Sequence, residues 1–147
     1  MPSSRRCEVC MTNNSVERIV YSITVTDIGV DVPALLEERM LVLFGPTVPA
    51  ELRDLCVVHD GLPTQYETLY VGGNVSFASQ EYRIVEIGEV ANTNFGGLGH
   101  LTVIFKDSGE LLPGCVRVTP DTVPSLSIGD TVTFETRVPL SSHVYMR

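Results

Sequence analysis

Short segments in which apolar and polar residues alternate recur along most of the chain. The clearest is Ile19–Val25, where the residues at every second position are Ile19, Tyr21, Ile23 and Val25. A repeat of two residues places alternate side chains on opposite faces of a strand, and β-branched residues favour that conformation. The predicted strands cover residues 19–25, 40–44, 55–59, 75–77, 82–87, 101–105, 115–119 and 131–135.

The spacing of these strands predicts the fold class. They are separated by Gly, Pro, Asp and Ser residues at intervals of roughly ten residues, which is typical of a small barrel or sandwich. No regular strand–helix–strand alternation supports a parallel α/β sheet. We therefore predict an all-β domain, a small closed or partly closed antiparallel barrel with one or two short helices.

Two segments carry helix signals. Asp31 can cap a helix that continues through Pro33 and residues 34–39, and Thr47 can cap a second through residues 49–54. By contrast, residues 92–100 contain three glycines and are predicted to form a loop between two strands.

Length, charge and hydropathy narrow the function classes. The 147 residues suit one domain, predicted over 19–140, with a flexible leader at 1–18 and a C-terminal tail at 141–147. The net charge is −8 and no basic stripe is visible, which argues against nucleic-acid binding. No apolar run of about 18 residues predicts a membrane span. The N-terminus lacks the apolar stretch of a secretory signal, so the expected compartment is the cytoplasm.

The cysteines do not predict a metal site or another cofactor. Cys7 and Cys10 form a C-x-x-C pair in the polar leader, but no further ligands lie at a fitting spacing. Cys56 and Cys115 lie in apolar strands, where a free cysteine usually serves core packing.

His59 is the first of two histidines that could carry chemistry. It ends an apolar predicted strand and precedes the turn signal Asp60-Gly61, so its imidazole is expected at a sheet rim within reach of a partner. Imidazole titrates near neutrality and can act as a nucleophile at that pH. A histidine satisfied by local hydrogen bonds at a strand end is the simpler interpretation of this position alone.

His100 follows the glycine-rich segment that contains Gly96, Gly97 and Gly99. Glycines accept positive φ, and successive backbone N–H groups can then converge on an anion. The segment is not a P-loop, because no Lys-Ser/Thr pair follows it. A plain connection between strands is the simpler interpretation here as well. The third histidine, His143, lies near the C-terminus and is expected to be inert.

Residues 85–105 contain a specific pattern, made up of Gly88, Val90-Ala91, Asn94, Leu98-Gly99-His100, Thr102 and Phe105. This pattern resembles that of a known family, the glucitol/sorbitol-specific IIA component of the bacterial phosphoenolpyruvate-dependent sugar phosphotransferase system. Weaker matches extend the resemblance over residues 19–137. After His59 this chain has Asp60-Gly61, where the family can carry a second histidine, and the leader is outside the family pattern.

The resemblance implies a phosphoryl carrier in sugar-alcohol uptake. His59 falls on the family's phosphorylation site, so it would accept a phosphoryl group from the histidine-containing phosphocarrier protein. The group would then pass to a cysteine of a IIB component and on to the polyol entering through the membrane IIC component. His100, Gly96, Gly97 and Gly99 would shield the phosphoryl charge.

Two other classes remain open. One is a β-barrel that binds a small molecule without chemistry, for which a ligand-sized apolar pocket would be the sign. The other is a regulatory interaction domain that has kept the fold and lost turnover, for which a buried or hydrogen-bonded His59 would be the sign. Assembly into a homo-oligomer is compatible with all three classes.

Overall fold

The computed structural model describes residues 6–11, 16–64 and 67–139. Nine strands, two short α-helices and one 3-10 helix occur in these ranges. In chain order they are β1 (Arg6–Met11), β2 (Val16–Ile28), α1 (Val32–Glu37), β3 (Met40–Phe44), η2 (Ala50–Leu55), β4 (Cys56–His59), β5 (Asn74–Phe77), β6 (Gln80–Ile87), α2 (Ala91–Leu98), β7 (Leu101–Ile104), β8 (Cys115–Thr119) and β9 (Thr131–Pro139).

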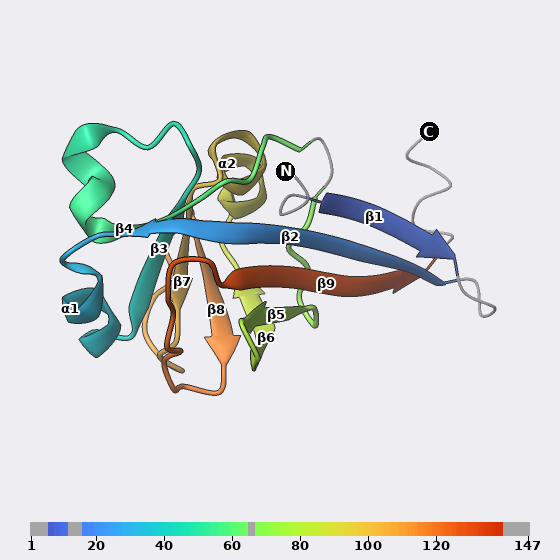
Figure 1. The fold of residues 1–147 in the computed structure, drawn as a ribbon. Coiled ribbons are helices and arrows are strands. Elements are labelled where there is room, and N and C mark those ends of the chain that lie inside the picture. Colours follow the sequence, from blue (N-terminus) through green and yellow to red (C-terminus); the bar gives the residue numbers. More distant parts are fainter. Residues whose placement is uncertain (1–5, 12–15, 65–66, 140–147) are drawn as a thin grey trace.

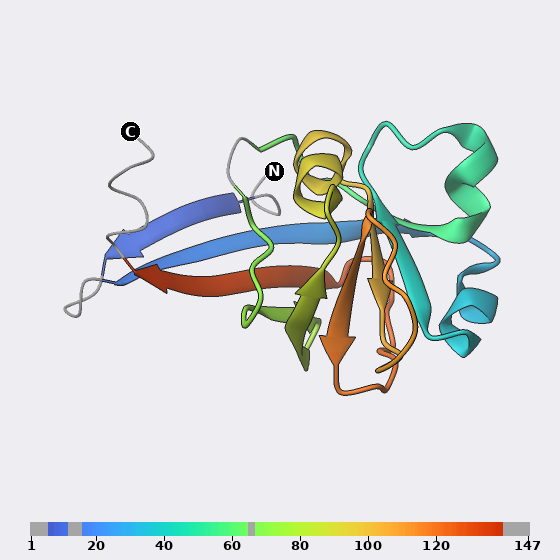
Figure 2. The same cartoon turned by 180° about the vertical axis from the view of Figure 1, so that it is seen from behind.

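Eight of the strands close into a barrel in the order β2-β4-β3-β7-β8-β6-β5-β9, because β9 also pairs with β2. The long strand β2 makes this closure possible. It pairs with β9 over Val16–Thr24, while its other edge pairs first with β1 and then, over Val25–Ile28, with β4. Figures 1 and 2 show β1, β2 and β9 extending as a ribbon beyond the rest of the barrel.

The prediction of a mainly β barrel is confirmed, but the expected antiparallel pairing is wrong at two places. β3 runs parallel to β4, and β7 runs parallel to β8. Parallel neighbours need a connection that returns the chain to the starting end of the sheet. Residues 45–55, which include η2, and residues 105–114 make these two returns.

The alternation that predicted the strands also fills the barrel. Ile19, Tyr21, Ile23 and Val25 are all buried, whereas Ser22 and Thr24 are partly exposed. Among the described residues, the largest fully buried side chains are five aromatic rings: Tyr21, Phe77, Phe95, Phe105 and Phe134. Burying so much apolar area supplies the main driving force for folding.

The N-terminal segment differs from the prediction. Residues 6–11 lie within the predicted flexible leader, yet they form β1, antiparallel to residues 17–22 of β2. Backbone pairing with a long neighbouring strand does not require the strong alternation that marks a buried strand. The side chains of Cys7 and Cys10, and all of residues 140–147, lie outside what is described.

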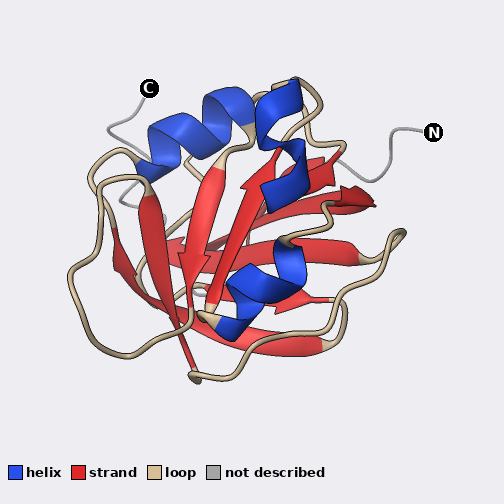
Figure 3. Ribbon diagram, turned by 90° about the vertical axis from the view of Figure 1, so that its left-hand side faces the viewer, coloured by secondary structure: helices blue, strands red, loops and turns tan. Residues whose placement is uncertain are grey.

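Figure 3 shows the helical segments outside the strands, along the upper side of the molecule and in front of the strands in that view. The predicted helices at 34–39 and 49–54 correspond to α1 and η2. The third helix, α2, replaces the loop predicted from the glycines at 92–100. Within the described ranges, no helix has the length and apolar character needed to cross a membrane.

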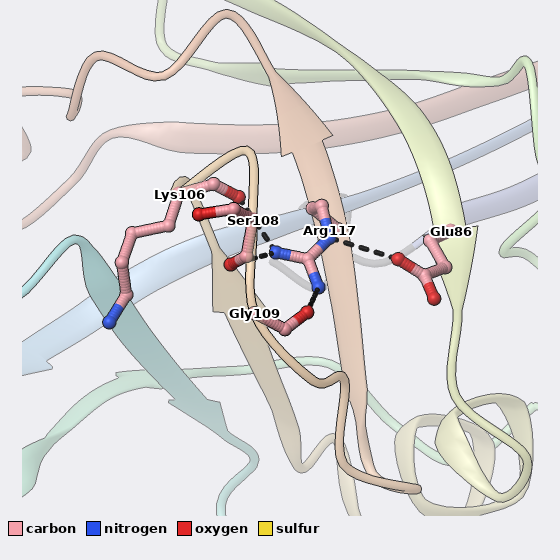
Figure 4. A network of polar contacts seen from close by, with 5 residues as sticks. All are labelled: Glu86, Lys106, Ser108, Gly109 and Arg117. Carbon is pink, nitrogen blue, oxygen red and sulfur yellow. Dashed lines mark hydrogen bonds and ion pairs between the residues drawn. The ribbon is translucent and has the colours of Figure 1, made fainter.

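One buried cation stabilises the connection after β7 (Figure 4). The side chain of Arg117, on β8, is only 7% exposed. Its guanidinium donates hydrogen bonds to the carbonyls of Lys106 and Ser108, both at 2.9 Å, and to that of Gly109. A fourth bond, 2.9 Å long, reaches the half-exposed carboxylate of Glu86. Arg117 therefore satisfies three carbonyls of one turn at once.

Candidate functional site: a buried histidine between two glycines

His59 is the last residue of β4, a strand whose four side chains are all buried. Its own side chain is 1% exposed, so the prediction of a reachable imidazole at the sheet rim is wrong. The strand end does lie where predicted, but two other segments cover the ring. One is the chain immediately after β4, at Gly61, and the other is the end of α2, at Gly99.

Both ring nitrogens of His59 have backbone partners. The Gly61 N–H donates to Nδ1 at 3.0 Å, and Nε2 lies 2.9 Å from the carbonyl oxygen of Gly99. A nitrogen that accepts from an N–H carries a lone pair, and a nitrogen facing a carbonyl carries a proton. These partners select the neutral tautomer in which Nε2 is protonated and Nδ1 is not.

Only glycine fits at the two positions that touch the ring. A Cβ at Gly99 would lie 2.6 Å from Cε1 and 2.7 Å from Nε2 of His59, and a Cβ at Gly61 would lie 2.9 Å from Nδ1. Gly99 also has φ of +69°, a left-handed conformation that L side chains disfavour. The ring is therefore enclosed by backbone rather than by side chains on these two sides.

The end of α2 explains why Gly99 lies there. Ala91 and Phe95, four residues apart, are the buried residues of this helix and give it a single apolar face. Phe95 packs on Phe134 with a centroid distance of 4.9 Å and lies 6.2 Å from the ring of His59. Gly99 then ends the helix, and its N–H donates to the Phe95 carbonyl at 2.9 Å.

The surroundings hold His59 neutral near pH 7. Burial lowers the pKa of its imidazole, while the Gly99 carbonyl and the charge of Asp60 act in the opposite direction. Asp60 is itself tied to β2, because its carboxylate accepts the N–H of Thr24 at 3.0 Å. A neutral imidazole, with one unprotonated ring nitrogen, is the nucleophilic form of histidine.

The other residues predicted to support the site have different surroundings. His100 follows Gly99, but its ring stacks on Phe44 with a centroid distance of 4.5 Å and an interplanar angle of 16°. Burial lowers its pKa as well. Gly96 and Gly97 belong to α2, so their conformation is helical and not the anion-binding loop that was predicted. His143 lies outside the described residues.

Several contributors were missed by the sequence interpretation. Sequence patterns indicate Gly61 only as a turn signal, Tyr21 only as a strand residue and Gly45 only as the end of a strand. Gly45 donates its N–H to the Leu98 carbonyl at 3.1 Å, and the Tyr21 hydroxyl donates to the Leu62 carbonyl at 3.2 Å. The four-residue spacing of Ala91 and Phe95, followed by a stop signal at Gly99, was the available clue to α2.

Comparison with known proteins connects this arrangement to one family. The family model described as "PTS system glucitol/sorbitol-specific IIA component" matches residues 20–133. Two proteins with the name "PTS system glucitol/sorbitol-specific EIIA component", from Shigella flexneri and Escherichia coli K12, are each 30% identical over 118 residues. Each alignment covers 80% of this chain and 95% of the relative.

A solved structure agrees with the sequence comparisons. The crystal structure of a PTS system IIA component from Enterococcus faecalis V583 superposes with a TM-score of 0.65 at 28% identity. The match covers 76% of this chain and 96% of that protein. The matched region of the family model runs from within β2 to the start of β9 and therefore includes the whole His59 site. The chain belongs to the glucitol/sorbitol-specific IIA component family of the PTS system.

Proposed function

We propose that this protein carries a phosphoryl group on His59 during sugar-alcohol uptake. The observation that carries the proposal is that both ring nitrogens of His59 have backbone partners, which favour a lone pair at Nδ1 and a proton at Nε2. The family supports the phosphoryl-carrier role in general, and His59 is the side chain in the described ranges whose surroundings best suit a phosphoryl acceptor.

The chemistry asks little of the protein. A neutral imidazole attacks phosphorus without first losing a proton, and it is a good leaving group in the next transfer. The protein has to orient the ring and to offset the charge on the phosphoryl oxygens. The donor would be the histidine-containing phosphocarrier protein and the acceptor a cysteine of a IIB component, with the IIC permease completing transport. These phosphoryl transfers would take place in the cytoplasm.

Transfer requires His59 to become accessible, because the ring is 1% exposed. The chain at Gly61 covers the ring on one side, and two hydrogen bonds fasten the residues that follow Gly61. The Tyr21 hydroxyl binds the Leu62 carbonyl at 3.2 Å, and the Thr64 N–H binds the Gly96 carbonyl at 2.9 Å. Breaking these two hydrogen bonds when a partner docks has a net cost of only about 1 kcal/mol each.

The same burial favours a second candidate, a regulatory domain that keeps the fold without phosphoryl turnover. In that case His59 would serve as a structural link between β4 and the end of α2. A ligand-binding barrel has less support, because the barrel interior is filled by aromatic side chains. A surface hollow of about 340 Å³ has a polar lining that includes Asn74, Glu135 and Arg137.

A phosphorylation assay separates the two candidates. The protein is incubated with phosphoenolpyruvate and the two general phosphotransferase proteins, and its labelling rate is followed by intact mass. We expect wild type and His100→Ala to take the label, the latter more slowly, and His59→Gln to take none while remaining folded. A folded His59→Gln protein that labels at the wild-type rate would remove His59 as acceptor. A wild type that never labels would favour the regulatory role.

A further inference from the structure

We propose that Nδ1 of His59 is the atom that accepts the phosphoryl group, and that the Gly99 carbonyl positions the ring for the transfer. This inference rests on the proposed function and deepens it. It follows from the two backbone groups that hold the imidazole.

The tautomer decides which nitrogen can attack. Nδ1 faces the Gly61 N–H at 3.0 Å, and a protonated Nδ1 would set two N–H groups against each other. Nε2 faces the Gly99 carbonyl at 2.9 Å and needs its proton to make that bond. The lone pair available for bonding to phosphorus is therefore on Nδ1.

The two sides of the ring also differ in how firmly they are covered. Gly99 is held by its own N–H bond to Phe95, by the helix that it terminates and by the close packing of Gly45. Gly61 also packs closely, against Tyr21 and Ile23, but it belongs to no helix or strand. It lies on the connection that leaves β4, directly after Asp60, whose N–H and carboxylate both bind Thr24. Opening after Asp60 uncovers Nδ1, whereas uncovering Nε2 would require the end of α2 to move.

The transfer step balances with these groups in place. The Nδ1 lone pair attacks phosphorus and an N–P bond forms, while the bond from phosphorus to the donor atom breaks and its electron pair leaves with the donor. The Gly61 N–H loses Nδ1 as its acceptor and becomes available to a phosphoryl oxygen. Nε2 keeps its proton, so the ring carries a positive charge beside the phosphoryl dianion.

The Gly99 carbonyl acts on this charge. It lies at the C-terminal end of α2, where the helix carries partial negative charge, and it accepts the proton of Nε2. The bond strengthens as the ring becomes cationic. A ring that stays protonated leaves as neutral imidazole when the N–P bond breaks, its electron pair returning to Nδ1. The carbonyl thereby keeps the phosphoryl group transferable, a role opposite to the phosphate shielding first expected of Gly99.

Nitrogen–phosphorus couplings test the assignment on the intact protein. The chain is labelled with ¹⁵N at the histidine ring nitrogens, and its ring resonances are recorded before and after phosphorylation by phosphoenolpyruvate and the general phosphotransferase proteins. In the free protein we expect the ¹⁵N chemical shift of Nδ1 of His59 to be that of an unprotonated ring nitrogen. After phosphorylation we expect a one-bond coupling of Nδ1 to ³¹P, with Nε2 still protonated.

Each other outcome contradicts a different claim. A one-bond coupling at Nε2 of His59, or a free protein with the proton on Nδ1, overturns the assignment of Nδ1 while leaving His59 as the acceptor. A label that is absent or lies on another residue overturns the proposed function and the assignment together. A phosphorylated ring that has lost the Nε2 proton overturns the positioning role of Gly99.

Discussion

Replacing Gly99 by alanine should destabilise the protein, whereas the same change at Gly97, two residues earlier, should not. A Cβ at Gly99 would lie 2.6 Å from Cε1 of His59 and 3.0 Å from Cα of Gly45, and φ there is +69°. At Gly97 an added Cβ would meet nothing within 4 Å, and the position lies in α2. The two variants therefore make the same chemical change in opposite surroundings.

The magnitude follows from three contributions at Gly99. The left-handed backbone costs an L residue about 1–2 kcal/mol. Forcing a methyl group into closely packed atoms costs about 1–3 kcal/mol more. The lower entropy of the unfolded chain returns about 0.4–1 kcal/mol. We expect Gly99→Ala to lower the free energy of unfolding by about 3 kcal/mol, and Gly97→Ala to leave it unchanged or raise it by about 0.5–1 kcal/mol.

Urea unfolding followed by circular dichroism measures the free energy of unfolding of both variants and of wild type. For a chain of this length the expected loss corresponds to a fall in Tm of about 6–12 °C for Gly99→Ala. The His59 ring resonances should also shift in Gly99→Ala and stay in place in Gly97→Ala. Equal stability of the two variants, or a Gly99→Ala protein as stable as wild type, would refute the described contact between Gly99 and His59.

Three further predictions concern a buried cation, a pH effect and a hydroxyl. Arg117→Lys should lower the free energy of unfolding by about 2–4 kcal/mol in urea titrations, because an ammonium cannot bind three carbonyls and Glu86 together. The control variant Glu86→Gln should lower it by under about 1 kcal/mol. Burial lowers the pKa of folded His59, so as pH falls below about 6.5 the unfolded chain binds the proton first and stability declines. That decline should be shallower in His59→Gln, measured by urea unfolding between about pH 5 and pH 7.5. Tyr21→Phe removes a hydrogen bond to Leu62, and it should speed phosphoryl labelling in a stopped-time mass assay; unchanged or slower labelling would count against opening at Leu62.

Alternation predicted most of the barrel because it reports a local property, the burial of one face of each strand. The segment Ile19–Val25 shows this directly, since its buried residues are those that the period of two selects. Pairing direction is not local. Nothing in residues 45–55 or 105–114 distinguishes a connection that returns along the barrel from one that reverses direction at its end. The parallel pairing of β3 with β4 and of β7 with β8 could therefore not be predicted from local sequence.

The glycines of α2 show a different limit. Gly96 and Gly97 weaken a helix by about 1 kcal/mol each relative to alanine, so local propensity favoured a loop. Tertiary packing of Phe95 on Tyr21 and Phe134 outweighs that cost. Similarly, the position of His59 at a strand end was predictable, but the segments that cover it come from Gly61 and Gly99. The contact with Gly99 spans a separation of 40 residues along the chain and cannot be inferred from local sequence.

The central claim is that His59 carries a phosphoryl group, and acid lability of the label tests it most directly. Wild-type protein is labelled with phosphoenolpyruvate and the two general phosphotransferase proteins, then divided between mild acid and base before intact mass is measured. A phosphoryl group on imidazole nitrogen should add about 80 Da that persists in base and is lost in acid, and His59→Gln should show no addition. An added mass that survives acid, or that appears equally in folded His59→Gln, would contradict the account.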